Sequence, residues 1–376
     1  MKGQMNPFVI SGYEGSEYFC DRVAETQQLA SEIANGNNVA LIATRRMGKS
    51  GLIQHYFSDP TIQEAYYTFF IDIYGTTSLS ELVLRLSREI LMRLKPFGRR
   101  AMDTFWNSVR SLQAGITFSP MGEPTFSVQL GQIREPSISL DEIFRYLDVA
   151  DKPCLVAIDE FQQIGNYPEK NIEATLRTYV QHCHNAQFIF SGSQRHTMSV
   201  MFTNASRPFF QSVSLMSLTE INREEYNRFA KEWFRKGNRV LADGVTEAVY
   251  ELSKGITWYT QKLFNTLYAQ TPEGETCLPQ DVADALDYIL RTQSYSYEEV
   301  LFRLPDRQKQ VLVALAKNGP AKNITSSAFL QAYALPSAST VQSAVRGLLE
   351  KEYITLFHGI YSVYDLFFGY WISREQ

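Results

Sequence analysis

The chain has 376 residues, of which 44% are hydrophobic and 20% are charged, as is usual for a globular protein of two or three domains. Its net charge of −4 argues against a surface coated with basic residues for nucleic acid. The four cysteines lie far apart without a CxxC spacing, so neither a zinc site nor a disulfide framework is indicated. We therefore expect reduced thiols, as in the cytoplasm. No apolar run approaches the ~18 residues that span a bilayer, so we expect no membrane partner and a cytoplasmic location.

The first stretch that carries chemistry follows an amphipathic helix expected at residues 23–35. The apolar run Val39–Ile42 predicts a strand buried on both faces, and a helix is expected at residues 51–57. Strand, loop and helix in this order predict a P-loop, which binds phosphate groups. The candidate nucleotide-binding residues of the loop are Ala43, Arg45, Arg46, Met47, Gly48, Lys49 and Ser50.

Each residue type in this loop has a chemical reason. Gly48 lets the backbone approach an anion, and free N–H groups at the start of the helix face that anion. Lys49 would reach the β- and γ-phosphates of ATP, and the Ser50 hydroxyl would bind Mg²⁺. Ala43 stands where the P-loop pattern has its first glycine, which is tolerable if its φ is negative. The alternative is a basic turn between core elements.

The middle of the chain alternates between apolar strands and helices. This alternation indicates a parallel α/β sheet with right-handed crossovers. One exception is a β-hairpin expected at residues 116–129 with its turn at Pro120–Pro124. The other expected elements are strands at 66–73, 154–161, 187–193 and 213–218, and helices at 79–94, 140–150, 171–184 and 222–236.

Two carboxylates, Asp159 and Glu160, follow the third buried strand. An apolar strand that ends in Asp-Glu about a hundred residues after a P-loop is typical of a Walker B motif. Asp159 would hold the Mg²⁺ that Ser50 also binds. Glu160 would act as general base for the attacking water, which predicts hydrolysis of ATP. The alternative is that both residues merely leave the core.

Polar residues after the next strand are further candidates. Ser191 and Ser193 would orient the water or the γ-phosphate, or would only cap the turn. Arg195 and Arg207 are candidates for stabilising charge in the transition state, or are surface residues. The predicted catalytic residues are therefore Glu160, Ser191, Ser193 and Arg207.

The C-terminal third has a different pattern. Helices replace strands from residue 219, and three helices followed by a hairpin at His358-Gly359 predict a winged helix. We therefore expect a P-loop ATPase core at residues 1–218, a helical lid at 219–297 and a winged-helix domain at 298–376. The aromatic segment Tyr361–Trp371 is too apolar to be left wholly in water, so we expect the winged helix to sit against the ATPase core in one nucleotide state. The alternative is that this segment packs into the core of the winged helix itself.

These motifs together resemble the archaeal-type ATPase family of AAA+/STAND-like P-loop proteins, which is related to initiator ATPases. The resemblance covers nearly the whole chain, and the segments that carry it are FCDR before the loop, RRMGKS, FIDI, IDEFQ and FSGS. It implies a core sheet in the order 5-1-4-3-2, a helical lid, and a nucleotide bound between core and lid. It also implies that Phe19, Asp21 and Arg22 lie near the adenine. One departure is that the residues after Gly255 lack the family's His and Pro.

Three functions are consistent with the sequence. The first is a Mg²⁺-dependent ATPase that acts as a nucleotide-controlled switch, in which the winged helix leaves the core in one nucleotide state. The second is a nucleotide-gated DNA-binding regulator or initiator-like protein that uses the winged helix. The third is an interaction protein that keeps its nucleotide, against which Glu160 argues. The winged helix is only mildly basic, so its partner, DNA or protein, stays open, as does the oligomeric state.

Overall fold

A computed structural model describes residues 6–94, 99–109, 111, 116–118, 124–126, 133 and 135–375. The described residues divide into two compact units. The P-loop unit comprises Val9–Tyr226 and Ile256–Trp258, and the C-terminal unit comprises the described residues of Met1–Phe8, Asn227–Gly255 and Tyr259–Gln376. In the part of the chain that the structure describes, no helix is both long and apolar enough to cross a membrane.

A five-stranded parallel sheet forms the centre of the P-loop unit. Its strands are β1 (Val39–Ile42), β2 (Tyr67–Asp72), β5 (Cys154–Asp159), β6 (Ala186–Gly192) and β7 (Ser214–Ser217). They lie in the order β2-β5-β6-β1-β7, which is 5-1-4-3-2 when these five strands are numbered along the chain. The predicted sheet order is therefore confirmed.

Side chains of the inner strands β1, β5 and β6 point alternately into two apolar cores. In β5, Val156 belongs to one core and Leu155 and Ala157 to the other, and all three are fully buried. This explains why these strands are mostly apolar instead of alternating with polar residues, whereas the edge strand β7 contains two serines and an exposed leucine.

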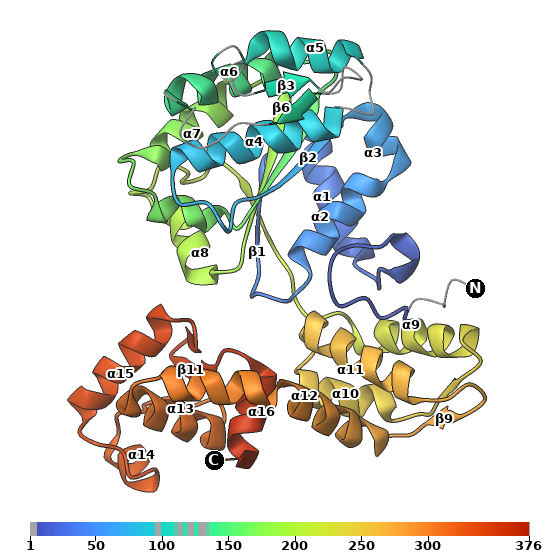
Figure 1. The fold of residues 1–376 in the computed structure, drawn as a ribbon, viewed down its shortest axis with the longest axis vertical. Coiled ribbons are helices and arrows are strands. Elements are labelled where there is room, and N and C mark those ends of the chain that lie inside the picture. Colours follow the sequence, from blue (N-terminus) through green and yellow to red (C-terminus); the bar gives the residue numbers. More distant parts are fainter. Residues whose placement is uncertain are drawn as a thin grey trace. The chain divides into compact units, whose positions relative to one another are not determined.

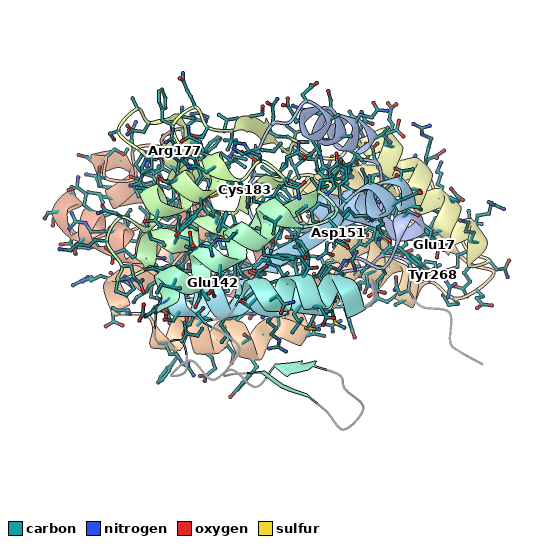
Figure 2. All side chains as sticks on the ribbon, turned by 90° about the horizontal axis from the view of Figure 1, so that it is seen from above. Glu17, Glu142, Asp151, Arg177, Cys183 and Tyr268 are labelled. Atoms are coloured by element: carbon teal, nitrogen blue, oxygen red, sulfur yellow. The ribbon has the colours of Figure 1, made fainter. Side chains whose placement is uncertain are left out.

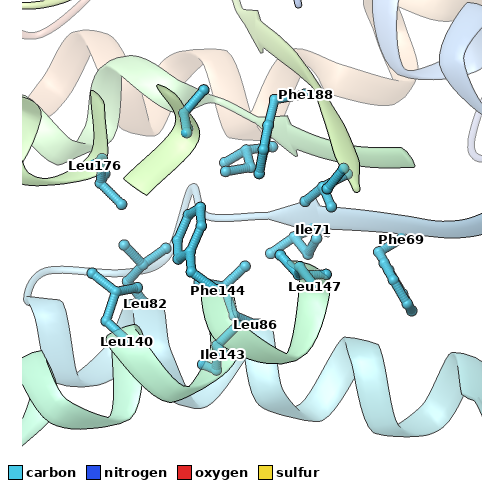
Figure 3. Packing of buried hydrophobic residues seen from close by; sticks show 14 of the residues in the cluster. Phe69, Ile71, Leu82, Leu86, Leu140, Ile143, Phe144, Leu147, Leu176 and Phe188 are labelled. Carbon is cyan, nitrogen blue, oxygen red and sulfur yellow. The ribbon is translucent and has the colours of Figure 1, made fainter. Parts of the chain in front are cut away.

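Helices cover both faces of the sheet (Figure 1). Figure 3 shows the core between the sheet and the helices α4 (Leu79–Leu94), α6 (Pro136–Val149) and α7 (Ile172–His182), where Leu82, Phe144 and Leu176 pack towards Phe188 of β6. Cys183, which directly follows α7 and is labelled in Figure 2, belongs to the same core. Its Sγ lies 3.9 Å from the backbone oxygen of Phe144 in α6. The helices of the unit are α1 (Val23–Ala34), α2 (Lys49–Ser58), α3 (Pro60–Ala65), α4 (Leu79–Leu94), α5 (Arg99–Ser108), α6 (Pro136–Val149), α7 (Ile172–His182) and α8 (Arg195–Thr203), with 3₁₀ turns at Ser16–Tyr18 and Phe161–Asn166.

The predicted hairpin is present, with one correction. β3 (Ile116–Phe118) pairs antiparallel with β4 (Pro124–Phe126). Pro124 was expected in the turn, but it is opposite Phe118 and begins the second strand. The other turn residues lie outside the described residues.

The C-terminal unit begins with the rest of α9 (Arg223–Lys236), whose first residues belong to the other unit. Three further helices follow, α10 (Val245–Ser253), α11 (Thr257–Gln270) and α12 (Asp281–Arg303). Strands were not expected here, but β8 (Val240–Leu241) pairs with β9 (Thr276–Cys277). Phe8 is fully buried in this unit and stacks on Phe264, although it precedes the P-loop in sequence.

A winged helix completes the chain. It consists of α13 (Asp306–Asn318), α14 (Ser327–Ala332), α15 (Ala338–Glu350) and the hairpin of β10 (Ile354–Phe357) and β11 (Ile360–Val363). The expected turn at His358-Gly359 is confirmed, because both residues have a positive φ.

The aromatic segment at the end forms a helix that the sequence did not predict. This helix, α16 (Leu366–Glu375), packs on α13 of the winged helix and on α12 (Figure 1). The boundary expected between residues 297 and 298 falls inside α12, so one continuous helix joins the predicted lid and the predicted winged-helix domain. The three-domain division stays a prediction.

Candidate functional site

The loop between β1 and α2 contains two residues in the left-handed conformation. Gly48 has φ 92° and Arg46 has φ 71°, and α2 begins directly after Gly48. Left-handed conformations are natural for Gly48 but strained for Arg46, so neighbouring contacts have to hold that residue. Ala43 is not among the described residues with a positive φ, so alanine fits this position.

Lys49 is buried inside this loop. Its Nζ donates to the backbone oxygens of Ala43 at 3.1 Å and Thr44 at 3.4 Å. Burial lowers the pKa of Lys49, the carboxylates of Glu160 and Asp159 partly offset this, and Arg45 lowers the pKa further. An ammonium with so little water around it gains more from a nearby phosphate than an exposed one does.

Asp159 connects three segments at the carboxyl edge of the sheet. Its Oδ2 accepts a hydrogen bond from Ser50 Oγ at 2.5 Å, and its Oδ1 accepts one from Ser191 Oγ at 2.5 Å. The Glu160 N–H also donates to Oδ1, at 3.1 Å. The structure therefore brings together the start of α2 and the ends of β5 and β6, where parallel sheets bind ligands.

The oxygens of Ser50 and Asp159 suit Mg²⁺ in kind and in number. Magnesium prefers oxygen ligands and is usually held by one or two protein groups together with phosphate and water. In the described part of the chain, no cluster of three or more His, Cys, Asp or Glu side chains could hold a metal alone. The donor set fits a metal ion that arrives with a nucleotide.

The Glu160 carboxylate accepts hydrogen bonds from two side chains, one after β6 and one in the 3₁₀ turn that follows Glu160 itself. Its Oε2 accepts from Ser193 Oγ at 2.7 Å and from Gln162 Nε2 at 2.5 Å. The sequence identified Ser193 but gave no role to Gln162, although it is the last residue of IDEFQ. The Oε1 of Gln162 is buried without a hydrogen-bond partner among the described residues.

The residues before the loop support it from outside. Arg22 is buried, pairs with Glu25 at 2.5 Å and donates to the backbone oxygen of Met47 at 3.2 Å. Phe19 stacks on His55 of α2, with ring centroids 4.3 Å apart. Asp21 has φ 54° and precedes Arg22 in the turn before α1. In this structure Phe19 and Arg22 therefore contact the loop and its helix.

The two arginines of the loop lie beside aromatic rings. Arg45 lies 5.6 Å from the ring centroid of Tyr74, and Arg46 lies 4.4 Å from that of Trp258. Trp258 was known from the sequence only as part of a segment that departs from the family pattern.

The structure does not bring Arg207 to these groups. Its guanidinium forms an ion pair with Glu173 of α7, and within the described residues no side chain of the loop or of the strand ends bonds to it. Burial raises the pKa of Glu173, and Arg207 partly offsets this effect. Arg195 is the first residue of α8. The pair between Arg207 and Glu173 connects the start of α7 to the segment after α8.

The winged helix presents a weakly charged surface. On α15 the exposed side chains are those of Ser339, Gln342, Ser343, Arg346 and Glu350. At the tip of the wing, Leu356 and Phe357 are each nearly half exposed. Such a surface is more apolar than the positively charged surfaces that usually bind DNA.

Comparison with known proteins supports the fold. Residues 295–374 match the family model of a probable winged helix domain. No curated protein matches the sequence significantly.

Three solved structures are similar over almost the whole chain. A Walker-type ATPase of Pyrococcus abyssi has a TM-score of 0.66 and 18% identity, covering 97% of this chain and 99% of its own. The ORC2 protein of Aeropyrum pernix, in ADPNP–ADP complexes, has a TM-score of 0.59 and 12% identity, covering 99% and 96%. The ORC1 protein of Aeropyrum pernix, in complex with DNA, has a TM-score of 0.53 and 12% identity, covering 95% and 93%. At these identities the similarity shows the fold, a P-loop ATPase core followed by helices and a winged helix.

Proposed function

We propose that this chain binds ATP with Mg²⁺ and hydrolyses it slowly as a nucleotide-controlled switch. The hydrogen bond between Ser50 and Asp159 carries this proposal, because it joins the two elements that hold a nucleotide-bound Mg²⁺ in P-loop ATPases. The similar ORC2 structure contains ADPNP and ADP, which supports an adenine nucleotide.

Each residue of the site has a part in this proposal. Lys49 would leave the backbone oxygens of Ala43 and Thr44 and bind the β- and γ-phosphates. Ser50 and Asp159 would hold Mg²⁺, which supplies positive charge to the phosphates. Glu160 would take the proton of the attacking water.

The two serines at the end of β6 position the carboxylates in this proposal. Ser191 bonds Asp159 and Ser193 bonds Glu160, so each serine fixes the direction of one acid. Arg207 would stabilise transition-state charge only after leaving Glu173. Phe19, Asp21 and Arg22 stay candidates for contacts near the adenine.

Binding is tested by Lys49→Ala. We expect the Kd for Mg-ATP to rise by about 10- to 100-fold, because a hydrogen bond to a charged group is lost. Isothermal titration calorimetry measures this, with Lys152→Ala on the surface of the same unit as a control. Equal affinity of Lys49→Ala and the wild type would overturn the assignment of the loop.

Hydrolysis is tested by Glu160→Gln. This variant should bind Mg-ATP like the wild type and hydrolyse it at least about 10²-fold more slowly, because an amide cannot take up the proton. Phosphate release measures the rate, and Glu64→Gln at an exposed position is the control. A wild-type rate in Glu160→Gln would mean that another group activates the water.

A nucleotide-gated DNA-binding protein is the second candidate. It is favoured by the match to a winged helix domain and by the similar ORC1 structure, which is in complex with DNA. The weak charge on α15 favours a protein partner instead. Gel-shift experiments with and without ATP distinguish the two, since only the second candidate predicts a nucleotide-dependent shift of duplex DNA.

A further inference from the structure

Two backbone oxygens of the P-loop are held by the first turn of α11. Thr257 Oγ1 donates to the Met47 oxygen at 3.1 Å, and the Trp258 backbone N–H donates to the Arg46 oxygen at 3.0 Å. Ile256–Trp258 belong to the same compact unit as the loop, whereas α11 from Tyr259 onward belongs to the other unit.

The start of a helix is well suited to this contact. The first N–H groups of a helix lack partners within the helix, and its dipole favours negative charge there. For the Trp258 N–H, the missing acceptor is the backbone oxygen of Arg46. Arg46 has φ 71°, so the contact stabilises a residue that would otherwise be strained.

Trp258 is itself fixed at both ends of its ring system. Its Nε1 donates to the backbone oxygen of Ile10 at 2.9 Å, and the Arg46 guanidinium lies 4.4 Å from its ring centroid. Thr257 lies against the next loop residue as well, because a Cβ on Gly48 would be 3.8 Å from its Cγ2. Arg46, Met47 and Gly48, the three residues before Lys49, are thus all in contact with Thr257 or Trp258.

The next residue along the helix has its partners at the C-terminus of the chain. The Tyr259 hydroxyl accepts a hydrogen bond from the Leu366 N–H at 2.9 Å, and its ring packs edge-on against Phe367 at 4.8 Å. Leu366 is the first residue of α16, so its N–H has no acceptor within the helix. The Tyr259 hydroxyl accepts from this N–H, as the Arg46 oxygen accepts from the Trp258 N–H at the start of α11.

We propose that Thr257 and Trp258 are positioning residues of the P-loop, and that Tyr259 passes the state of the loop to α16 and the winged helix. This inference rests on the nucleotide binding proposed above. It assigns the coupling to three consecutive residues, 257–259, in the segment that lacks the family's His and Pro.

The physical basis is a difference in contacts between two states of the loop. In this structure Lys49 Nζ donates to the backbone oxygens of Ala43 and Thr44. When a phosphate takes the ammonium, those oxygens lose their donor and the loop adjusts. A ligand shifts a conformational equilibrium only through such differences. α11 contacts the same loop two to four residues further along, at Arg46, Met47 and Gly48.

The positioning role is tested by Thr257→Val, which removes the hydroxyl and keeps a methyl group near Gly48. We expect the Kd for Mg-ADP to rise by about two- to tenfold, because the bond to the Met47 oxygen is lost together with the 3.5 Å bond that the hydroxyl accepts from Arg22 Nη2. Thr266→Val, whose hydroxyl donates to the Lys262 backbone oxygen in the preceding turn of the same helix, should leave the Kd unchanged. Equal effects of the two variants would overturn the positioning role.

The coupling is tested by hydrogen exchange in the full-length protein. Mg-ADP should change the exchange rate of the Leu366–Phe368 amides by at least about twofold in the wild type and not in Tyr259→Phe. Tyr370→Phe, whose hydroxyl bonds Leu252, should respond like the wild type. If the exchange rates of the Leu366–Phe368 amides in the wild type were the same with and without bound Mg-ADP, the coupling would be overturned.

Failure of the proposed function has a different signature. If the wild type does not bind Mg-ADP in calorimetry, both the function and this inference are overturned. If it binds and the variants behave like their controls, only this inference is overturned. Circular dichroism checks that each variant is folded, and Thr257→Val in the exchange experiment replaces Tyr259→Phe if the latter unfolds.

Discussion

Gly192, at the end of β6, is packed against the residue that holds Glu160. A Cβ at this position would lie 2.2 Å from Gln162 Oε1 and 2.6 Å from the side chain of Met198. The φ of Gly192 is not positive, so the requirement for glycine is space and not backbone conformation. Since Gln162 donates to Glu160, the fit at Gly192 affects the candidate general base.

We therefore expect Gly192→Ala to lower the free energy of unfolding by about 1–3 kcal/mol, as overpacking of a core does. ATP hydrolysis should fall as well, because Gln162 has to move. Urea unfolding and phosphate release measure the two effects.

Gly165→Ala is the matched control for this prediction. No atom lies within 4 Å of a Cβ at Gly165, and its φ is not positive. The free energy of unfolding should change by less than about 0.5 kcal/mol. If Gly192→Ala and Gly165→Ala had equal free energies of unfolding, the side chains of Gln162 and Met198 would be able to move aside without loss of stability.

At the residue scale, the sequence predicts candidates where the proposed chemistry restricts the residue type. Lys49, Ser50 and Asp159 were predicted because few residue types can serve beside phosphate and Mg²⁺, and the structure brings Ser50 and Asp159 into contact. Gln162 and Thr257 were missed, because their roles arise from contacts and not from a motif. The bond from Thr257 to Met47 joins residues 210 positions apart, and no local pattern encodes such a pair.

At the scale of elements, the buried strands were predictable, but several helices, among them α16 and α8, were not. A strand covered on both faces needs apolar residues throughout, and this leaves a clear signal in β5 and β6. α16 left no such signal, since it is apolar on several sides and has a glycine in its middle.

The glycine in α16 faces the wing. A Cβ at Gly369 would lie 3.4 Å from Cβ of Val363 in β11, at the near limit of ordinary van der Waals contact, so α16 packs against the wing at this position. The tertiary contact thus overrides the low helix propensity of glycine. α8 was missed for a related reason, because its Thr, Ser and Val residues are weak helix formers.

At the scale of the whole molecule, the described residues form two compact units, and the division into three domains stays a prediction. Sequence patterns mark a change of element type, as at residue 219, but they do not show which elements share a core. Here α12 continues from the predicted lid into the winged helix, and the aromatic residues of α16 pack on it. We infer that the predicted lid and the winged helix move together.

This inference predicts that the contact between α12 and α16 stabilises the C-terminal unit. Tyr297 of α12 is 8% exposed and lies 5.0 Å from the ring centroid of Phe368 and 5.7 Å from that of Trp371. Tyr297→Ala should lower the free energy of unfolding by about 3–5 kcal/mol, because it removes a large buried ring. Urea unfolding of the full-length protein, followed by circular dichroism, measures the change.

Tyr295→Ala is a matched control for this prediction, since it makes the same change two residues earlier on α12. Tyr295 is 78% exposed, so its loss should change the free energy of unfolding by less than about 0.5 kcal/mol. If Tyr297→Ala were no more destabilising than Tyr295→Ala, α16 would depend on the winged helix alone. The winged helix would then be free to move without α12, and the coupling through Tyr259 would lose its rigid connection.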